Sequence, residues 1–199
     1  FKPNVSGKET YLYIKTGATI EDLYTEIKNK DLLNDLGNFS QAAAKMELAT
    51  RLKPGRYRLS KGMTNRSLIN MIKAGNQEAV KLKFHNIRKK EDFAAYLAKS
   101  LESDSLAFIN VIDSAALIEK YGFTSDNIYT MFIPNTYEMY WNTSAVDFFN
   151  RMQKEYTKFW TDERKAKAQA LNMTPQQVTI LASIVDGEAL LQLANQPSS

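Results

Sequence analysis

The sequence contains no cysteine, and this absence excludes disulfide bonds, thiolate zinc sites and cysteine nucleophiles. It contains one histidine, His85. A histidine-rich metal site is therefore excluded, and a Ser-His-Asp triad would have to use this residue, which we expect on a strand within VKLKFHNI. No stretch approaches the roughly 18 consecutive apolar residues of a membrane span, and the N-terminal FKPNVSGKET lacks the pattern of a signal peptide. We expect a soluble chain that uses neither a cofactor nor a metal ion.

The composition is that of a globular protein. Of the 199 residues, 44% are hydrophobic and 24% are charged, and a chain of this length can bury roughly 70% of the surface that its unfolded form exposes. The net charge of +4 suits an anionic partner, such as nucleic acid, a membrane surface or an acidic polymer. The basic residues are spread along the chain and do not alternate with aromatic residues, so we expect no nucleic-acid partner.

Two segments repeat one pattern. YIKTGATIEDLYTEI (13–27) and YRLSKGMTNRSLINMI (57–72) each join an extended segment to Gly-x-Thr and then to Leu-x-x-x-Ile. Alternating residues predict a strand, the glycine a turn, the threonine a helix N-cap, and apolar residues four apart a helix face. A third copy without the glycine is expected at 80–97. The matched pairs are Gly17 and Gly62, Thr19 and Thr64, Leu23 and Leu68, and Ile27 and Ile72, with Phe93 and Leu97 as the helix-face residues of the third copy.

The pattern along the chain predicts an α+β fold with two domains. A change in character at 73–79 places the first domain at 1–79 and a mainly helical second domain at 80–199. Within the first, residues 30–52 are predicted to be helical with an interruption near Gly37, and LKPGRYRL (52–59) to be a turn that leads into a strand. The helices expected in the second domain are 90–101, 104–121, 143–160 and one from 175, which begins with a capping box of Thr174, Pro175 and Gln177.

The last predicted helix carries TILASIVDGEAL (179–190), an apolar run followed by two carboxylates. On a helical wheel, position 188 falls within the apolar stripe and Asp186 on the opposite side, provided that the helix continues through Gly187. We expect the stripe to be buried, so that desolvation raises the pKa of Glu188 and makes it a usable general acid. The alternative is that Glu188 only ends a helix that is leaving the core. The stripe consists of Val178, Ile180, Leu181, Ile184 and Val185.

The segment MFIPNTYEMYWNTS (131–144) has an unusual composition for a short loop or edge strand. Its aromatic residues are interleaved with amides and hydroxyls. A pyranose offers an apolar C–H face and a rim of hydroxyls, so this combination suits sugar binding. The alternative is that the aromatic residues belong to the core. The residues concerned are Phe132, Asn135, Thr136, Tyr137, Tyr140, Trp141 and Asn142.

Three motifs in this order, LKPGRYRLSKGMT, FIPNTYEMYW and LASIVDGEA, resemble the endolytic murein transglycosylases of the MltG/YceG-like family over nearly the whole chain. The resemblance implies LysM-like strand-helix units at 1–79, followed at 80–199 by the N-terminal part of the family's catalytic domain. It also implies the family's reaction, which cleaves the MurNAc-GlcNAc bond within peptidoglycan glycan strands without water and leaves 1,6-anhydroMurNAc ends. Carried across by position, the family's catalytic glutamate falls on Glu188.

The same resemblance implies the surroundings of the reaction. The expected partners are peptidoglycan glycan strands and, from the family, cell-wall synthases. The expected location is the cell envelope, at the periplasmic face of the inner membrane, with membrane contact only through an anchor that we expect to be missing from this chain. The substrate-binding residues that we expect are Asn135, Thr136, Tyr137, Trp141 and Asp186.

The sequence departs from the family pattern in several places. Asn135 stands where the family has aspartate, Asp186 replaces the first glutamate of a Glu-x-Glu pair, and the segment around Asn86 lacks the usual Glu-Gly. Family members also continue beyond the last helix, whereas this sequence ends eleven residues after Glu188. We therefore expect a fragment, or a chain from which intervening residues are missing. The alternative function is a non-catalytic peptidoglycan-binding or scaffold module whose repeated units grip the polysaccharide.

Overall fold

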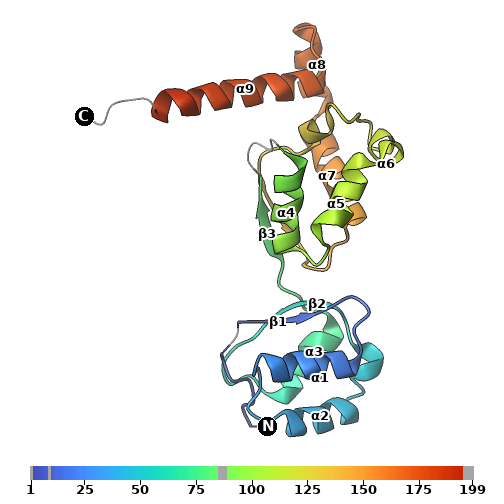
Figure 1. Cartoon of the computed structure of the whole chain (residues 1–199), viewed down its shortest axis with the longest axis vertical. Coiled ribbons are helices and arrows are strands. Elements are labelled where there is room, and N and C mark those ends of the chain that lie inside the picture. The colour runs from blue at the N-terminus through green and yellow to red at the C-terminus, as the bar shows by residue number, and fades with distance from the viewer. Residues whose placement is uncertain (1, 9, 85–88, 195–199) are drawn as a thin grey trace, which may run out of the picture. The chain divides into compact units, whose positions relative to one another are not determined.

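The structure, a computed structural model, describes residues 2–8, 10–84 and 89–194, with side chains as far as Asp186. It divides into two compact units. The first unit comprises residues 1–81 together with 99–102 and 138–143, and the second comprises 82–98, 103–137 and 144–199. Helices and short antiparallel strands make up both (Figure 1). The predicted α+β class is confirmed.

The first unit packs helices against one side of a two-stranded antiparallel sheet (Figure 1). In the sheet, Leu12 lies opposite Tyr57, and both are fully buried, as is the neighbouring Ile14. Because side chains alternate along a strand, Tyr11 and Tyr13 lie on the other face. The elements, in order, are β1 (Tyr11–Ile14), α1 (Ile20–Asn29), α2 (Leu36–Lys45), the short 3-10 helix η1 (Ala49–Arg51), β2 (Gly55–Arg58) and α3 (Asn65–Ala74).

The repeated sequence pattern forms two equivalent strand-turn-helix segments, β1 to α1 and β2 to α3. Gly17 and Gly62 both have φ of +79°, a left-handed conformation that glycine adopts without strain. The side chains of Thr19 and Thr64 each accept a hydrogen bond from the backbone N–H three residues later, at the start of the helix. The apolar helix positions of both copies are buried, namely Leu23, Ile27, Leu68 and Ile72. The predicted repeat is confirmed in these details.

The interruption expected near Gly37 is wrong. Gly37 lies in the first turn of α2, which begins at Leu36 and is capped by the side chain of Asp35. The irregular segments flank this helix instead, and Asp31 and Glu47 have positive φ in them. Glycine lowers helix propensity by about 1 kcal/mol relative to alanine, but the capping carboxylate and the burial of Phe39 stabilise the helix around it.

The strands β3 (Val80–Lys83) and β4 (Thr136–Met139) form a second two-stranded sheet. Its strands are antiparallel, because a later residue of one strand contacts an earlier residue of the other. The Phe84 N–H donates to the Asn135 carbonyl at 3.0 Å, and the Lys81 ammonium nitrogen lies 3.7 Å from a carboxylate oxygen of Glu138. The remaining elements are α4 (Lys90–Ser100), α5 (Ser105–Asp113), α6 (Ala115–Lys120), the 3-10 helix η2 (Ile128–Met131), α7 (Ala145–Phe159), α8 (Asp162–Ala170) and α9 (Pro175–Ala194).

Aromatic rings fill the core of the second unit. Phe148 of α7 is completely buried, and the centroids of five other phenylalanine rings lie 5.3–6.1 Å from its own. Phe93 and Leu97 of α4 are buried, as the expected third copy of the pattern requires. Residues 85–88 of that copy, with His85, which we expect on a strand, and Asn86, lie outside the described residues. The five rings are those of Phe84, Phe93, Phe108, Phe132 and Phe149.

One expectation for the second unit is wrong, and one of its helices was missed. The helix expected at 104–121 is divided at Ser114, whose φ and ψ of −82° and 97° are extended. Helix α8 was not predicted, because its sequence DERKAKAQA is polar on almost every side and shows no apolar stripe. None of the helices in the described part of the chain has both the length and the apolar character needed to cross a bilayer.

Candidate functional site

The segment 131–144 carries four of the expected substrate-binding residues. Asn135 and Thr136 are exposed where the chain enters β4. The Asn135 side-chain carbonyl accepts a hydrogen bond from the Thr136 N–H at 2.7 Å, so the amide is tied to the local turn. Both residues belong to the second unit, whereas Trp141 belongs to the first.

Tyr137 supports this segment from the core. Its side chain is 6% exposed and its ring centroid lies 5.3 Å from that of Phe84. Its hydroxyl donates to the Ile133 carbonyl at 2.7 Å, and burial raises its pKa to about 12. The tyrosine therefore holds the Pro-containing turn in place with a neutral hydroxyl.

Helix α9 begins as predicted. The Thr174 side chain accepts a hydrogen bond from the Gln177 N–H, and the Gln177 side chain accepts one from the Thr174 N–H. The helix continues through Gly187 as far as Ala194, and Asp186 is exposed. The side chain of Glu188 lies outside the described residues, so its expected burial and raised pKa stay predictions.

The apolar stripe of α9 is not buried among the described residues, which contradicts our expectation. Its four C-terminal members are 43–60% exposed, namely Ile180, Leu181, Ile184 and Val185. The helix packs on η2 and α8 near its beginning, and its later turns extend away from them (Figure 1). Helical periodicity shows which side of a helix is apolar, but it does not show what covers that side.

The first turns of α9 meet the FIPN motif at an apolar cavity of about 330 Å³ in the second unit. Ile133 and Pro134 line one side of it, and Val178 and Ala182 line another. Trp160, at the end of α7, also lines the cavity. The indole is 5% exposed, and its N–H has no hydrogen-bond partner among the described residues. Two motifs separated by about 45 residues in the sequence are therefore brought together here.

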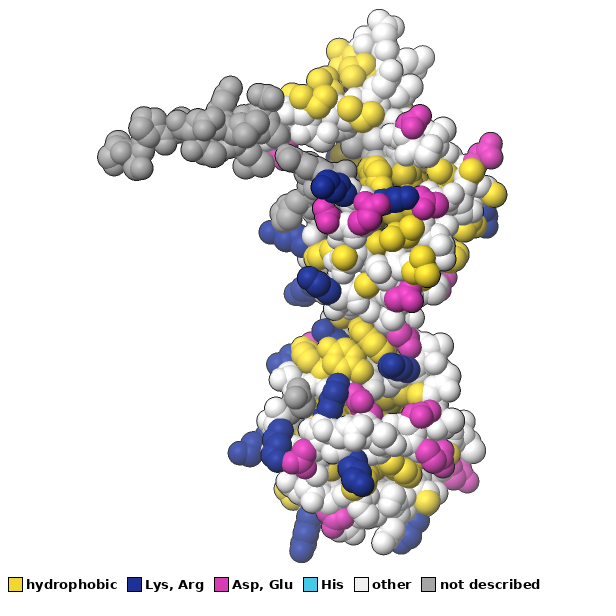
Figure 2. Space-filling view, viewed as in Figure 1, with side chains coloured by type: hydrophobic (Ala, Val, Ile, Leu, Met, Phe, Trp, Pro, Cys, Tyr) yellow, Lys and Arg dark blue, Asp and Glu magenta, His cyan; other side chains and the backbone are white. Residues whose placement is uncertain are grey.

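Charge is divided unequally between the two units. The first unit contains 15 Lys and Arg residues and 10 Asp and Glu residues, a net charge of +5, whereas the second is close to neutral. Figure 2 shows Lys and Arg side chains spread over the visible face of the first unit, with fewer acidic ones between them. Among the residues whose side chains are described, no three acidic or histidine side chains gather as a metal site would require.

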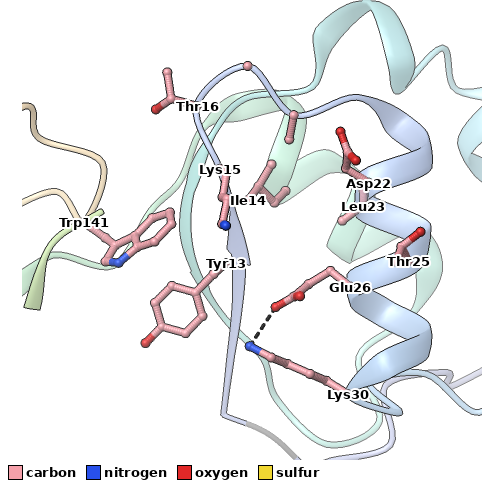
Figure 3. Close-up of a pocket in the computed structure, with 12 residues that line it drawn as sticks. Tyr13, Ile14, Lys15, Thr16, Asp22, Leu23, Thr25, Glu26, Lys30 and Trp141 are labelled. Carbon is pink, nitrogen blue, oxygen red and sulfur yellow. Dashed lines mark ion pairs between the residues drawn. The ribbon is translucent and has the colours of Figure 1, made fainter. Parts of the chain in front are cut away.

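A second cavity, of about 630 Å³, lies in the first unit beside β1 (Figure 3). Tyr13, the turn after β1, one side of α1 and Trp141 line it, and all of its lining residues belong to this unit. Sequence reasoning identified Trp141 but not Tyr13, although strand alternation already places Tyr13 on the outer face. It also missed Glu102, which bonds to this turn, because nothing in the local sequence distinguishes that residue.

Comparison with known proteins adds to this geometry. The sequence model of the YceG-like family matches residues 12–195. The chain is also similar to a protein from Listeria monocytogenes described as YceG-like, whose crystal structure at 2.6 Å resolution aligns with 20% sequence identity and a TM-score of 0.43. That alignment covers 85% of this chain and 61% of the other, so the chain spans about three fifths of that protein's length. No curated protein sequence matches the chain significantly.

Proposed function

The chain belongs to the YceG-like family, as its motifs predict, and we propose from this membership that it acts as a peptidoglycan lytic transglycosylase with Glu188 as the acid-base group. The proposed location is the cell envelope. The observation that supports the proposal most directly is the cavity that Ile133 and Pro134 share with Val178 and Ala182. This cavity supports the proposal because it brings the FIPN segment next to Ala182 of the LASIVDGEA motif.

Helix geometry favours position 188 over position 186. Two positions that are two residues apart on a helix differ by about 200° around its axis. Because α9 is helical through residue 194, position 188 follows Ile184 by four residues and Leu181 by seven, along the apolar side. A carboxyl group on that side would lose hydration when a glycan strand covers the helix, and desolvation favours its protonated form.

The proposed reaction needs one carboxyl group. Glu188 gives its proton to the bridging oxygen as the bond from C1 of MurNAc breaks. The resulting carboxylate then takes the proton of the MurNAc 6-hydroxyl, whose oxygen forms the new bond to C1. The carboxyl group ends the cycle protonated and no water is consumed, so the second carboxylate of an ordinary glycosidase is not required.

Digestion of purified sacculi tests this proposal. We expect the wild-type chain to release muropeptides with anhydro ends, detectable by mass spectrometry, and Glu188→Gln to release at least about 100-fold less, because general acid-base catalysis contributes roughly 10²–10⁴-fold. The matched control is Asp126→Asn, which alters an exposed carboxylate of the second unit outside the proposed site, and it should keep most of the activity. Equal product from wild type and Glu188→Gln would dismiss Glu188 as the acid.

The second candidate function is a non-catalytic module that binds peptidoglycan. The exposed stripe of α9 favours it, because the described residues leave position 184 in contact with solvent. This candidate predicts that the chain sediments with insoluble sacculi and releases no fragment from them. Sedimentation together with anhydro-ended products would exclude it.

A further inference from the structure

The cavity beside β1 in the first unit has two walls of different chemistry (Figure 3). One wall is aromatic and is formed by Tyr13 and Trp141, both of which are partly exposed. The other is the polar side of α1, where Glu26 and Lys30 form an ion pair at 2.7 Å. Its volume of about 630 Å³ is within the range of roughly 300–1,000 Å³ that is typical of small-molecule sites.

The aromatic wall presents two surfaces that differ in direction. The rings of Tyr13 and Trp141 meet edge to face, with centroids 5.0 Å apart and an interplanar angle of 68°. The Lys30 ammonium lies 5.3 Å from the centroid of the Tyr13 ring. A sugar ring with an apolar C–H face can pack on one of these surfaces while its hydroxyls reach the polar wall.

The polar wall contains both donors and acceptors. The Lys30 ammonium offers three donors and the Glu26 carboxylate only acceptors, and their side chains are 40% and 31% exposed. The third charged group of this wall, Asp22, is already used, because its carboxylate accepts hydrogen bonds from the Thr19 N–H and hydroxyl. On α1, Glu26 and Lys30 are therefore the charged groups available to hydroxyl and acetamido substituents, and Lys15 also lines the cavity from the segment after β1.

Glu102 fixes the two chain segments that border the cavity, the turn with Thr16 and the segment with Trp141. Its two carboxylate oxygens accept hydrogen bonds from the Thr16 N–H and the Thr16 hydroxyl, each at 2.7 Å. Its own N–H donates to the Trp141 carbonyl at 2.8 Å. One residue thus joins the turn after β1 to the segment that carries the indole, and a site held in this way loses less conformational entropy when a ligand binds.

We propose that this cavity is a glycan-binding subsite for one or two N-acetylated amino-sugar units of a polysaccharide strand. Tyr13 and Trp141 are its stacking surfaces, Glu26 and Lys30 its hydrogen-bonding groups, and Glu102 its positioning residue. The net charge of +5 on the first unit favours a strand that also carries carboxylates. The identification of that strand as peptidoglycan rests on the proposed function, whereas the geometry of the subsite does not.

Titration with the soluble hexamer of N-acetylglucosamine, followed by calorimetry, tests the subsite, and sedimentation with purified sacculi gives a second readout. We expect Trp141→Ala and Tyr13→Ala each to weaken hexamer binding at least about tenfold and to reduce the fraction bound to sacculi. Tyr140→Ala is the matched control, because Tyr140 is 55% exposed next to Trp141 and does not line the cavity. Unchanged affinity in both variants, or no binding of the hexamer by the wild-type chain, would overturn the proposal.

Further variants separate binding from folding. Glu26→Gln alters a partly exposed helix residue and is expected to weaken hexamer binding several-fold without changing the thermal unfolding curve. Glu102→Ala should weaken binding, and Glu102→Gln should restore part of it, because an amide oxygen can still accept from Thr16. A Glu102→Gln variant that binds no better than Glu102→Ala would remove Glu102 from its positioning role.

The binding experiment tests the subsite independently of whether the chain is a transglycosylase. Glu188→Gln should bind the hexamer as the wild type does, whether or not it loses turnover. A chain that binds through Trp141 but never releases anhydro ends would keep this subsite and end the transglycosylase proposal. If the chain releases anhydro ends, and its Tyr13→Ala and Trp141→Ala variants bind the hexamer as the wild type does, the transglycosylase proposal stands and this subsite is ruled out.

Discussion

Glu78 illustrates how single side chains organise the outer face of the first unit. The Tyr11 hydroxyl donates to one of its carboxylate oxygens at 2.6 Å, and an Arg58 guanidinium nitrogen lies 3.3 Å from the other. The Arg56 guanidinium lies over the Tyr11 ring and donates to the carbonyls of Glu78 and Ala79. These contacts hold residues 78 and 79 against β2.

The same contacts make stability depend on pH. The hydrogen bond from Tyr11, followed by the hydrogen bond from Arg58 and the positive charges of Arg58 and Arg56, lowers the pKa of Glu78 in the folded state. The carboxylate therefore stabilises the fold above its unfolded pKa of about 4.3, and this contribution is lost as pH falls through the lower folded pKa. The free energy of unfolding, obtained by urea unfolding, should therefore fall less between about pH 5 and pH 3 in Glu78→Gln than in the wild type.

Circular dichroism at each pH measures this effect. The control is Glu21→Gln, which alters an exposed carboxylate in the first turn of α1, and its pH dependence should follow the wild type. If Glu78→Gln and the wild type lose stability in parallel on acidification, the hydrogen bond from Tyr11 does not stabilise the ionised form.

At the scale of residues, the sequence identified notable side chains but did not predict whether they are buried or exposed. The aromatic composition of 131–144 drew attention to Tyr137 and Trp141, yet the first ring is buried and the second is partly exposed. Strand alternation does not explain this difference, because Trp141 lies two residues beyond the end of β4 and an unbroken strand would place positions 137 and 141 on the same face. Glu102 could not be predicted, since its partner Thr16 is 86 residues away.

At the scale of elements, helix beginnings were the most predictable feature. Thr19, Thr64 and Thr174 each cap a helix where the sequence places a threonine before a periodic segment. These signals are local, so they do not depend on the rest of the fold. Burial of a helix face is not local, and the stripe of α9 was therefore predicted correctly as a stripe and wrongly as a buried one.

Substitutions on that stripe test its exposure in solution. Leu181 and Ile184 are 49% and 56% exposed, and substitutions at such surface positions usually change stability by less than about 0.5 kcal/mol. We expect Leu181→Gln and Ile184→Gln to leave the free energy of unfolding of the chain unchanged within this limit. Urea unfolding followed by circular dichroism provides the measurement.

A buried residue of the same unit gives the comparison. Phe148 is completely buried among five phenylalanine rings, and Phe148→Ala should destabilise the second unit by about 3–5 kcal/mol. A loss above about 2 kcal/mol in Leu181→Gln would instead mean that another part of the chain, or another molecule, covers α9 in solution.

At the scale of the whole molecule, the unequal charge of the two units predicts a salt effect. A net charge of +5 on the first unit should strengthen its association with a strand that bears carboxylates, and dissolved salt screens such attraction, since the Debye length falls from about 10 Å at 0.1 M to about 3 Å at 1 M. We expect the fraction of protein that sediments with sacculi to fall several-fold between about 0.05 M and 0.5 M NaCl.

The neutral hexamer of N-acetylglucosamine is the control for this prediction. Its affinity should change little over the same range, because it carries no charge for the first unit to attract. Sedimentation with sacculi that does not respond to salt would show that the basic residues of the first unit take no part in binding.

The first unit also consists of three separate stretches of chain, residues 1–81, 99–102 and 138–143. During synthesis the ribosome delivers them in that order, and domains generally begin to fold from the N-terminal end as the chain emerges. A nascent chain can form the β1–β2 sheet and its helices early. The hydrogen bonds from Thr16 to Glu102, and the contact between the rings of Tyr13 and Trp141, can form only after the later residues have been synthesised. The cavity beside β1 is therefore completed only after residues 82–98 and 103–137 of the second unit have been translated.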